Sequence, residues 1–228
     1  MNEEFLRISS GIPGLDDMIE GGFPFPSTIL VAGGAGTGKT TFALQFLFEG
    51  AKKGEKGLYF TTLSESTQWL LRFTSKFSFV KKEYLEKYVR CTELGVILKK
   101  PKDITIETIP FMEEIIAKFM PKRIVIDPIT VIGNMIKEDY RLFLFDLTTR
   151  LKNWQATTIL TGEVMPSEPY PLDVAYIADG MILLSNIEEG KRRRRYLEVL
   201  KMRGTAHTTG KHLSDIDLDG FIVTPGVK

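Results

Sequence analysis

Short apolar runs alternate with amphipathic segments through the first two thirds of the chain. The first run, residues 28–32, is rich in β-forming side chains, which is typical of a buried parallel strand. Similar runs predict strands at 57–62, 88–91, 123–127 and 157–161. Apolar residues at helical spacing predict helices at 41–53, 68–77, 105–120 and 140–153. The alternation predicts an α/β fold with a mostly parallel central sheet flanked by helices.

The last third of the chain has a different pattern. Residues 178–185 and 195–201 are strand-like, and the polar stretch 186–190 reads as their connection. A further apolar segment, 221–224, is preceded by Gly220. These segments predict antiparallel strands appended to the parallel core. Because no long linker interrupts the pattern, residues 1–228 are expected to form a single domain.

Composition narrows the class of protein without indicating a partner. The chain has 228 residues, 43% of them hydrophobic, and a formal net charge of +1, so no global charge attracts it to nucleic acid or membrane. A single cysteine, Cys91, excludes a disulfide framework, and two histidines, His207 and His212, argue against a catalytic metal cluster. No run of 18 apolar residues and no signal peptide is apparent, so we expect no membrane association and a cytoplasmic location.

Residues 33–40 match the complete phosphate-binding pattern G-x-x-x-x-G-K-[ST]. The pattern lies between a predicted strand and a predicted helix, where backbone N–H groups and the helix dipole favour an anion. Lys39 supplies a charge for the β- and γ-phosphates, and the Thr40 hydroxyl can ligate Mg²⁺. The sequence therefore predicts an ATP site with Mg²⁺ as its metal. Its nucleotide-binding residues are Gly36, Thr37, Gly38, Lys39, Thr40 and Thr41.

Hydrolysis of a nucleotide also requires carboxylates near the phosphates. Asp127 follows three apolar β-branched residues at the end of a predicted strand, which suits a residue that holds Mg²⁺ through water. Glu65, just beyond the strand at 57–62, is the candidate for orienting the attacking water; its alternative role is a favourable charge at a helix N-terminus. Glu163 is the alternative candidate to Glu65 for the catalytic base. Thr161 either senses the γ-phosphate or is an ordinary strand-end residue.

Two basic segments lie in the C-terminal third. Residues 191–195 are all lysine or arginine, and they fit a nucleic-acid contact, a subunit interface or simply a solvated hairpin tip. Lys201 and Arg203 share one face of a predicted strand, because side chains alternate with a period of two. Such a pair would suit a triphosphate as an arginine finger does, or it could be an ordinary pair of strand charges.

An ordered set of motifs resembles the KaiC-like ATPases of the RecA/RadA superfamily. The motifs are residues 10–16, 33–40, 123–127, 178–180 and 201–205. The resemblance extends over residues 8–221, and the chain looks like one KaiC-type module, whereas KaiC carries two in tandem. It implies a RecA-like P-loop fold and a homohexameric ring with ATP between subunits. It also implies that Lys201 and Arg203 act in trans as catalytic residues, with Thr205 and His207 near the same nucleotide.

The chain departs from the family pattern at the expected catalytic base. KaiC-type modules carry two adjacent glutamates after the second strand, and the corresponding pair here is Ser64 and Glu65. Slow hydrolysis, or ATP binding with little turnover, is therefore expected as an alternative to an active ATPase. No counterpart of the autophosphorylated pair of KaiC is identified, so no clock function is expected.

Three hypotheses about partners stay open at this point. The first is an ATPase acting on a macromolecule, and the second is a nucleotide-controlled assembly switch that binds a protein. The third is an accessory protein on single-stranded DNA, which RecA and RadA bind through two loops that correspond to residues 129–138 and 164–175. The second loop carries no lysine or arginine, which argues against strong DNA binding there.

Overall fold

A nine-stranded, mostly parallel sheet forms the centre of the molecule. The computed structural model describes residues 6–62, 67–98, 104–165 and 167–226. The strand order is β11-β10-β9-β8-β3-β7-β6-β4-β5. Six strands run parallel: β3 (Thr28–Gly33), β4 (Gly57–Thr61), β5 (Val89–Glu93), β6 (Arg123–Asp127), β7 (Thr157–Glu163) and β8 (Gly180–Glu189). Three antiparallel strands follow: β9 (Arg192–Met202), β10 (Lys211–Asp217) and β11 (Gly220–Thr224). The predicted fold class is confirmed.

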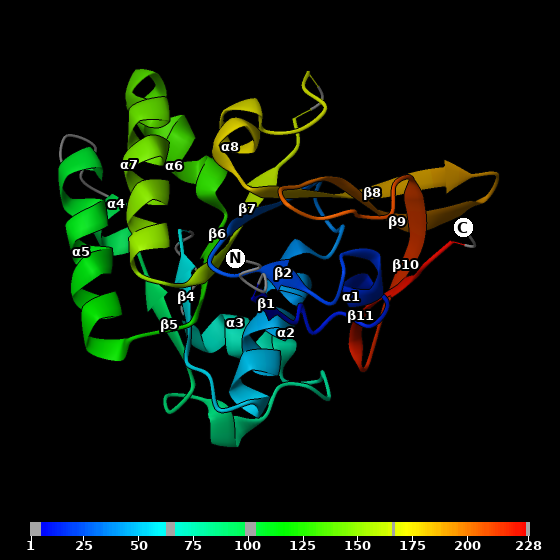
Figure 1. The fold of residues 1–228 in the computed structure, drawn as a ribbon, viewed down its shortest axis with the longest axis horizontal. Helices are drawn as coiled ribbons and strands as arrows, with labels where there is room; N and C mark the ends of the chain where they lie inside the picture. The colour runs from blue at the N-terminus through cyan, green and yellow to red at the C-terminus, as the bar shows by residue number, and fades with distance from the viewer. Residues whose placement is uncertain (1–5, 63–66, 99–103, 166, 227–228) are drawn as a thin grey trace, which may run out of the picture.

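Helices cover both faces of the sheet because every central strand is apolar on both sides. In β3, Ile29 and Val31 pack on one face and Leu30 and Ala32 on the other. The first face holds α1 (Leu15–Met18), α2 (Lys39–Lys52) and α3 (Thr67–Thr74). The second holds α4 (Gly95–Leu98), α5 (Ile104–Phe119), α6 (Ile129–Ile136), α7 (Tyr140–Asn153) and α8 (Leu172–Ile177). Figure 1 shows α5 and α7 side by side, away from the C-terminal strands.

The helical spacing read from the sequence identifies the buried side of α5 correctly. Ile109, Met112, Ile116 and Phe119 are all buried against the sheet, as their spacing predicts. The predicted boundaries of β6 and α7 are confirmed to the residue. No helix among the described residues is long and apolar enough to cross a membrane.

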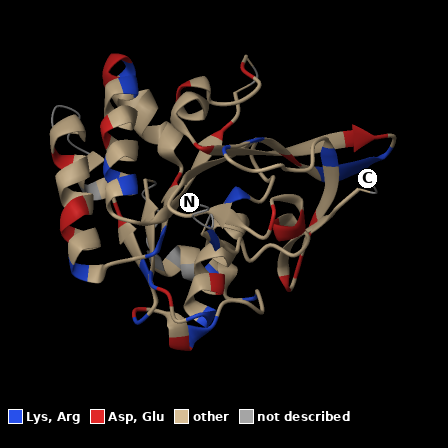
Figure 2. Cartoon of the chain, viewed as in Figure 1, with Lys and Arg blue, Asp and Glu red and all other residues tan. Residues whose placement is uncertain are grey.

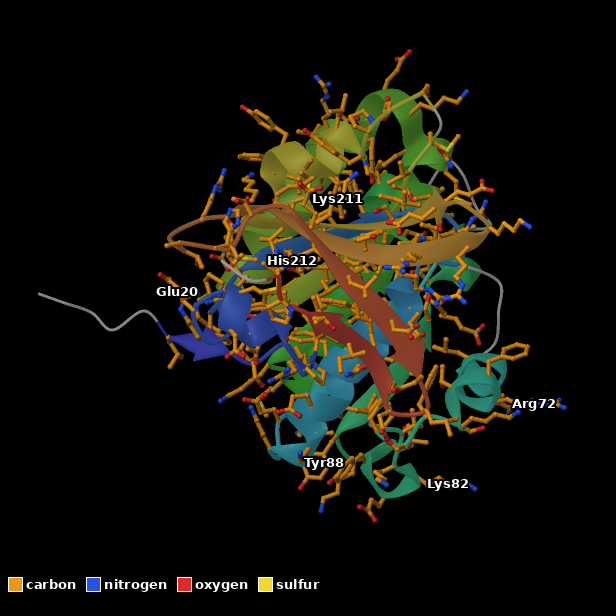
Figure 3. All side chains as sticks on the ribbon, turned by 90° about the vertical axis from the view of Figure 1, so that its right-hand side faces the viewer. Glu20, Arg72, Lys82, Tyr88, Lys211 and His212 are labelled. Atoms are coloured by element: carbon orange, nitrogen blue, oxygen red, sulfur yellow. The ribbon has the colours of Figure 1, made fainter. Side chains whose placement is uncertain are left out.

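Two local predictions were wrong, and one strand was missed. The stretch 186–190 is not a connection, because β8 and β9 continue through it and form a long hairpin that turns at Gly190, with φ +62°. This hairpin extends away from the helices (Figure 1). Residues 129–136 form α6 rather than a loop, since Ile129 and Ile132 are buried against the sheet. Strand β10, which pairs with both β9 and β11, was not predicted; Figure 3 shows it with Lys211 and His212.

The N-terminal segment is held against the sheet by a buried arginine. A short two-stranded sheet joins β1 (Arg7–Ile8) to β2 (Phe23–Pro24). The Arg123 side chain, at the start of β6, is fully buried. It donates hydrogen bonds to the carbonyls of Ser9 and Phe46 and pairs with Glu55 at 2.7 Å. Its guanidinium also lies over the Phe46 ring. One charged group thus connects the chain start, α2 and the sheet.

Candidate functional site

The phosphate-binding pattern forms the turn between β3 and α2. Gly36 and Gly38 have φ values of +73° and +101°, in the left-handed region that glycine adopts without strain. A Cβ atom on Gly38 would lie 2.5 Å from the end of the Ile216 side chain, which would have to shift to make room. Gly38 is the N-cap of the 14-residue α2. The loop therefore directs the positive end of a long helix into one site.

Lys39 is buried, and its ammonium group lies across the phosphate loop. The Nζ atom donates hydrogen bonds of 2.9 Å to the carbonyls of both Gly33 and Gly34. It also lies 2.9 Å from the Glu163 carboxylate, at the end of β7. The carboxylate of Glu163 thus supplies a negative charge beside Lys39. Glu163, a rival base by sequence, therefore lies inside the candidate site.

Asp127 lies at the carboxyl end of β6, between two neighbouring strands. Its Oδ2 atom accepts a hydrogen bond of 2.8 Å from the Thr40 hydroxyl and a second, short one from the Tyr59 hydroxyl on β4. Its Oδ1 atom accepts a short hydrogen bond from the Thr161 hydroxyl on β7. The carboxylate is almost completely buried. Thr161 therefore contacts the predicted metal residue in this structure, a contact that the sequence did not predict.

Burial and the charge of Asp127 hold the pKa of the Tyr59 phenol well above its ordinary value. The phenol consequently stays protonated and remains a hydrogen-bond donor to Asp127 at physiological pH. From the sequence, Tyr59 was only a residue of a buried strand. A polar residue near the end of an otherwise apolar strand beside Asp127 is the signal that could have identified it.

A cavity of about 550 Å³ opens over the phosphate loop. Its walls include loop residues, the Asp127 group and the two strand ends that flank them. They are Ala35, Gly36, Gly38, Lys39, Thr40, Thr41, Tyr59, Thr61, Leu70, Asp127, Pro128 and Glu163. Hydroxyl and carboxylate oxygens suit Mg²⁺, which keeps much of its water shell in such sites, while Lys39 and the helix N-terminus suit phosphates. The residues present therefore fit Mg²⁺ and a nucleoside triphosphate. The predicted Ser64 and Glu65 lie outside the described residues.

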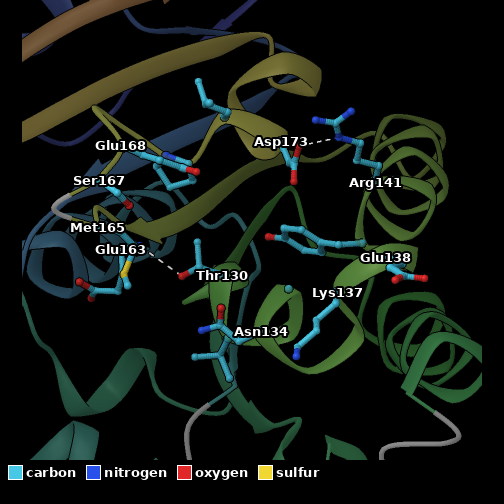
Figure 4. Close-up of a pocket in the computed structure, with 15 residues that line it drawn as sticks. Thr130, Asn134, Lys137, Glu138, Arg141, Glu163, Met165, Ser167, Glu168 and Asp173 are labelled. Atoms are coloured by element: carbon cyan, nitrogen blue, oxygen red, sulfur yellow. Dashed lines mark hydrogen bonds and ion pairs between the residues drawn. The ribbon is translucent and has the colours of Figure 1, made fainter.

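A second cavity, of about 710 Å³, adjoins the first and shares Glu163 with it. Figure 4 shows Glu163 near Thr130 of α6, whose hydroxyl accepts a hydrogen bond of 3.2 Å from the Glu163 backbone N–H. Arg141 lines this cavity and is paired with Asp173 at 2.6 Å. The charged side chains in its walls are Lys137, Arg141, Glu138, Glu163, Glu168 and Asp173. The acidic majority does not suit a polyanion such as DNA.

Lys201 and Arg203 lie at the opposite edge of the sheet from the phosphate loop. Arg203 is paired at 3.0 Å with Asp179, whose carboxylate also accepts the Thr28 backbone N–H at 3.0 Å. Thr28 begins β3, and the phosphate loop starts at the other end of that strand, about 16 Å away at ~3.3 Å per residue. The Arg203 side chain is 57% exposed. This arginine therefore cannot reach the phosphate loop of its own chain.

The Lys201 ammonium is occupied within its own chain. It donates hydrogen bonds to the carbonyls of Ala175 and Ala178, at the end of α8, at 3.2 and 2.5 Å. Burial, with the positive charge of Arg203 nearby, lowers the pKa of Lys201. Arg203 is thus the more accessible of the two cations.

Thr205 and His207 follow Arg203 along the same edge. The Thr205 hydroxyl accepts a hydrogen bond of 3.1 Å from Arg7, and the His207 ring nitrogen Nδ1 lies 3.4 Å from the Thr208 carbonyl. The described structure thus divides the predicted residues into two groups. Lys39, Thr40 and Asp127 lie together at the phosphate loop, whereas Lys201, Arg203, Thr205 and His207 do not.

The basic tip of the β8–β9 hairpin is partly neutralised by nearby acids. Arg194 pairs with Glu189 at 3.3 Å, and Arg195 pairs with Asp215 at 3.4 Å. Figure 2 shows acidic and basic residues together at the end of this hairpin. These contacts fit the interpretation of a solvated hairpin tip better than that of a nucleic-acid contact.

Comparisons with known proteins agree with the motifs. The family model described as "ATPase: KaiC" matches residues 8–228. Circadian clock oscillator protein KaiC of Parathermosynechococcus lividus is 33% identical over 95% of this chain and 42% of its own length. The KaiC of Prochlorococcus marinus subsp. pastoris is 34% identical over 95% of this chain and 45% of its own length. The chain thus spans less than half the length of these relatives.

A solved structure is similar over nearly the whole chain. The crystal structure of a KaiC-like protein from the hyperthermophilic archaeon Pyrococcus horikoshii OT3 superimposes with a TM-score of 0.84 at 35% identity. The match covers 97% of this chain and all of the archaeal one.

Proposed function

This chain belongs to the KaiC family of ATPases, and we propose that it binds Mg²⁺-ATP at the phosphate loop and hydrolyses it where two copies of the chain meet. The loop at 33–40 would bind the phosphates through its backbone N–H groups, with Thr37 and Thr41 beside them, and Lys39 would neutralise their charge. Thr40 and Asp127 would hold the metal and its water. The bound metal would neutralise charge that develops on the phosphates.

The observation that supports an active site shared between two subunits is the separation of Arg203 from the phosphate loop of its own chain. Within a single chain, Lys39 lies at the loop and is paired with Glu163. Lys201 and Arg203, the candidates for the role of an arginine finger, lie at the opposite edge of the sheet. A second copy that places Arg203 against this loop would complete the site. As the family resemblance implies, we propose a homohexameric ring. In this ring, Lys201, Thr205 and His207 would lie with Arg203 near the nucleotide that the neighbouring subunit binds.

The surface around Arg203 suits a contact between copies. Phe145 and Tyr176 are 65% and 84% exposed, and both line a cavity of about 350 Å³ together with Arg203. Large exposed aromatic side chains beside a polar group are typical of protein interfaces. Burying this surface against a second copy would bring the arginine with it.

For the water-activating step we propose Glu65, with Glu163 engaged elsewhere. The Glu163 carboxylate is paired with Lys39 through Oε1, so this residue is already engaged with a phosphate-binding side chain. In the sequence, Glu65 follows β4, whose last residue, Thr61, is paired with Asp127. We propose that Glu65 orients water next to the γ-phosphate.

A nucleotide-controlled assembly switch is the second candidate function. Glu163 supports it, because this residue lines both the phosphate cavity and the neighbouring cavity between α6 and the chain after β7. ATP binding would separate Glu163 from Lys39 and thereby alter the second cavity, where a protein partner would respond. Turnover would then be slow, as Ser64 in the expected glutamate position suggests.

ATP hydrolysis by the purified protein, with its mass measured in parallel, tests these proposals. Turnover that is confined to the oligomer and abolished by Lys39→Ala is the expected result. ATP binding and assembly without turnover would favour the switch. ATP-dependent binding of single-stranded DNA that weakens with salt would instead favour the third hypothesis. Full turnover by a monomer would contradict the shared site.

A further inference from the structure

The Asp127 carboxylate is fixed by hydroxyl groups from both neighbouring strands. In the sheet, β6 lies between β7 and β4. Thr161 on β7 donates to Oδ1 from one side, and Tyr59 on β4 donates to Oδ2 from the other. The hydroxyl of Thr40, from the helix after the phosphate loop, also donates to Oδ2 at 2.8 Å. The carboxylate is therefore held in one orientation at the floor of the nucleotide cavity.

The Asp127 carboxylate keeps one acceptor site open beside the hydroxyl groups that hold it. A carboxylate offers about four lone-pair sites, and three of them are filled here by hydroxyl donors. Oδ2 already accepts two hydrogen bonds, whereas Oδ1 accepts one from Thr161. One site on Oδ1 thus remains for a water of the metal. The Thr40 hydroxyl donates its hydrogen to Asp127, so its oxygen would ligate the cation through a lone pair.

The packing of Tyr59 does not explain its hydroxyl. The ring belongs to the apolar core on the α2 side of the sheet, where a phenylalanine would fill the same volume. The hydroxyl instead lies beside the carboxylate, lining the nucleotide cavity. Thr161 is similarly buried, at 0% exposure, in a strand where valine would suit the core. Both buried hydroxyls donate to Asp127.

We propose that Tyr59 and Thr161 are positioning residues that orient Asp127, and that they set how much Mg²⁺ the protein needs to retain ATP. This inference rests on the proposed ATP-binding function. Groups that hold a metal-binding carboxylate are ordinarily needed for metal affinity, and their loss typically costs about 10- to 100-fold. Without the Tyr59 hydroxyl, Asp127 would keep only its hydrogen bonds from Thr40 and Thr161, and its carboxylate would be oriented less firmly toward the metal's water.

The test measures the binding of a fluorescent ATP analogue, mant-ATP, while MgCl₂ is titrated at constant ionic strength. Tyr59→Phe is expected to raise the half-saturating Mg²⁺ concentration about tenfold. Thr161→Val, which is also nearly isosteric, is expected to shift it in the same direction. Binding of mant-ATP in excess EDTA is expected to stay unchanged in both variants. A merely structural defect would instead weaken binding with and without Mg²⁺ alike.

Tyr140→Phe is the matched control. Tyr140 is also buried, but its hydroxyl donates to the Ile129 carbonyl at 3.2 Å and does not contact Asp127. Its half-saturating Mg²⁺ concentration is expected to equal that of the unmodified protein. In an Asp127→Asn background, Tyr59→Phe is expected to cause no further shift, since the group that it positions has changed.

The outcomes separate this inference from the proposed function. If the unmodified protein binds mant-ATP and neither Tyr59→Phe nor Thr161→Val changes the Mg²⁺ requirement, the positioning role is wrong and ATP binding stands. If the unmodified protein does not bind mant-ATP at any Mg²⁺ concentration, both are wrong. Thermal melting of each variant shows whether it folds. If Tyr59→Phe does not fold, the Mg²⁺ titration of Thr161→Val tests the inference by itself.

Discussion

The Lys39 ammonium lies 2.9 Å from the Glu163 carboxylate, inside the cavity over the phosphate loop. This pair joins the loop after β3 to the end of β7, which are neighbouring strands of the sheet. An anion that binds beside Lys39 in this position must displace the Glu163 carboxylate. The pair therefore links occupancy of the phosphate site to the position of the chain after β7.

Replacing Glu163 by glutamine is expected to tighten ATP binding about two- to fivefold. Without the carboxylate, the phosphates no longer compete with a negative charge for Lys39; because Glu163 is 43% exposed, solvent screening keeps the effect modest. Isothermal titration calorimetry with a non-hydrolysable ATP analogue measures the change. Glu168→Gln is the control, since Glu168 lines only the second cavity. Unchanged or weaker binding by the Glu163 variant would contradict competition at Lys39.

Replacing Arg123 by alanine is expected to lower the free energy of unfolding by about 3–5 kcal/mol. The change removes a fully buried guanidinium together with its ion pair to Glu55 and its hydrogen bonds to two backbone carbonyls. Urea unfolding measures the difference. Arg141→Ala breaks a pair on a side chain that is 84% exposed and is expected to cost no more than about 1 kcal/mol. Equal losses in the two variants would contradict the role of burial.

The Cys91 thiol is expected to react very slowly with iodoacetamide in the folded protein. Burial, together with the nearby charge of Glu86, raises the pKa of Cys91 to about 12. At pH 8 only roughly one thiol in 10,000 would then be the reactive thiolate. The labelling rate should rise about tenfold per pH unit up to pH 10, because the folded-state pKa lies above that range. In protein unfolded in urea, the labelling rate should reach a plateau above pH 9. The same plateau in the folded protein would contradict the raised pKa of Cys91.

Much of the fold could be predicted from local patterns. The β6 and α7 boundaries follow from a clean apolar run and a clean helical period, which tertiary packing did not override. Strand β10 was missed because its sequence, with charged residues at alternate positions, lacks an apolar run, and only pairing on both sides makes it a strand. The hairpin was predicted too short for a related reason: the pairing of Glu188 with Arg193 continues beyond the apolar residues.

The candidate site divides in the same way. The phosphate loop and Asp127 were found because each lies at the end of an apolar strand in a recognisable pattern. The contacts of Tyr59 and Thr161 with Asp127 could not be predicted, since they depend on β6 lying between β4 and β7. Sequence spacing also could not show that Arg203 lies at the opposite edge from Lys39. The roles of these residues in catalysis remain predictions.

Mixing two inactive variants tests the shared site most directly. Lys39→Ala retains Arg203, and Arg203→Ala retains the phosphate loop, so each protein alone is expected to be inactive. In rings assembled from equal amounts, random mixing places an intact loop against an intact arginine at roughly a quarter of the interfaces. We predict that the mixed rings hydrolyse ATP at about that fraction of the unmodified rate. Arg192→Ala is the control for Arg203→Ala, and this protein should be active without mixing. No recovery in mixed rings of unmodified mass, or full activity of Arg203→Ala alone, would contradict a site completed by the neighbouring subunit.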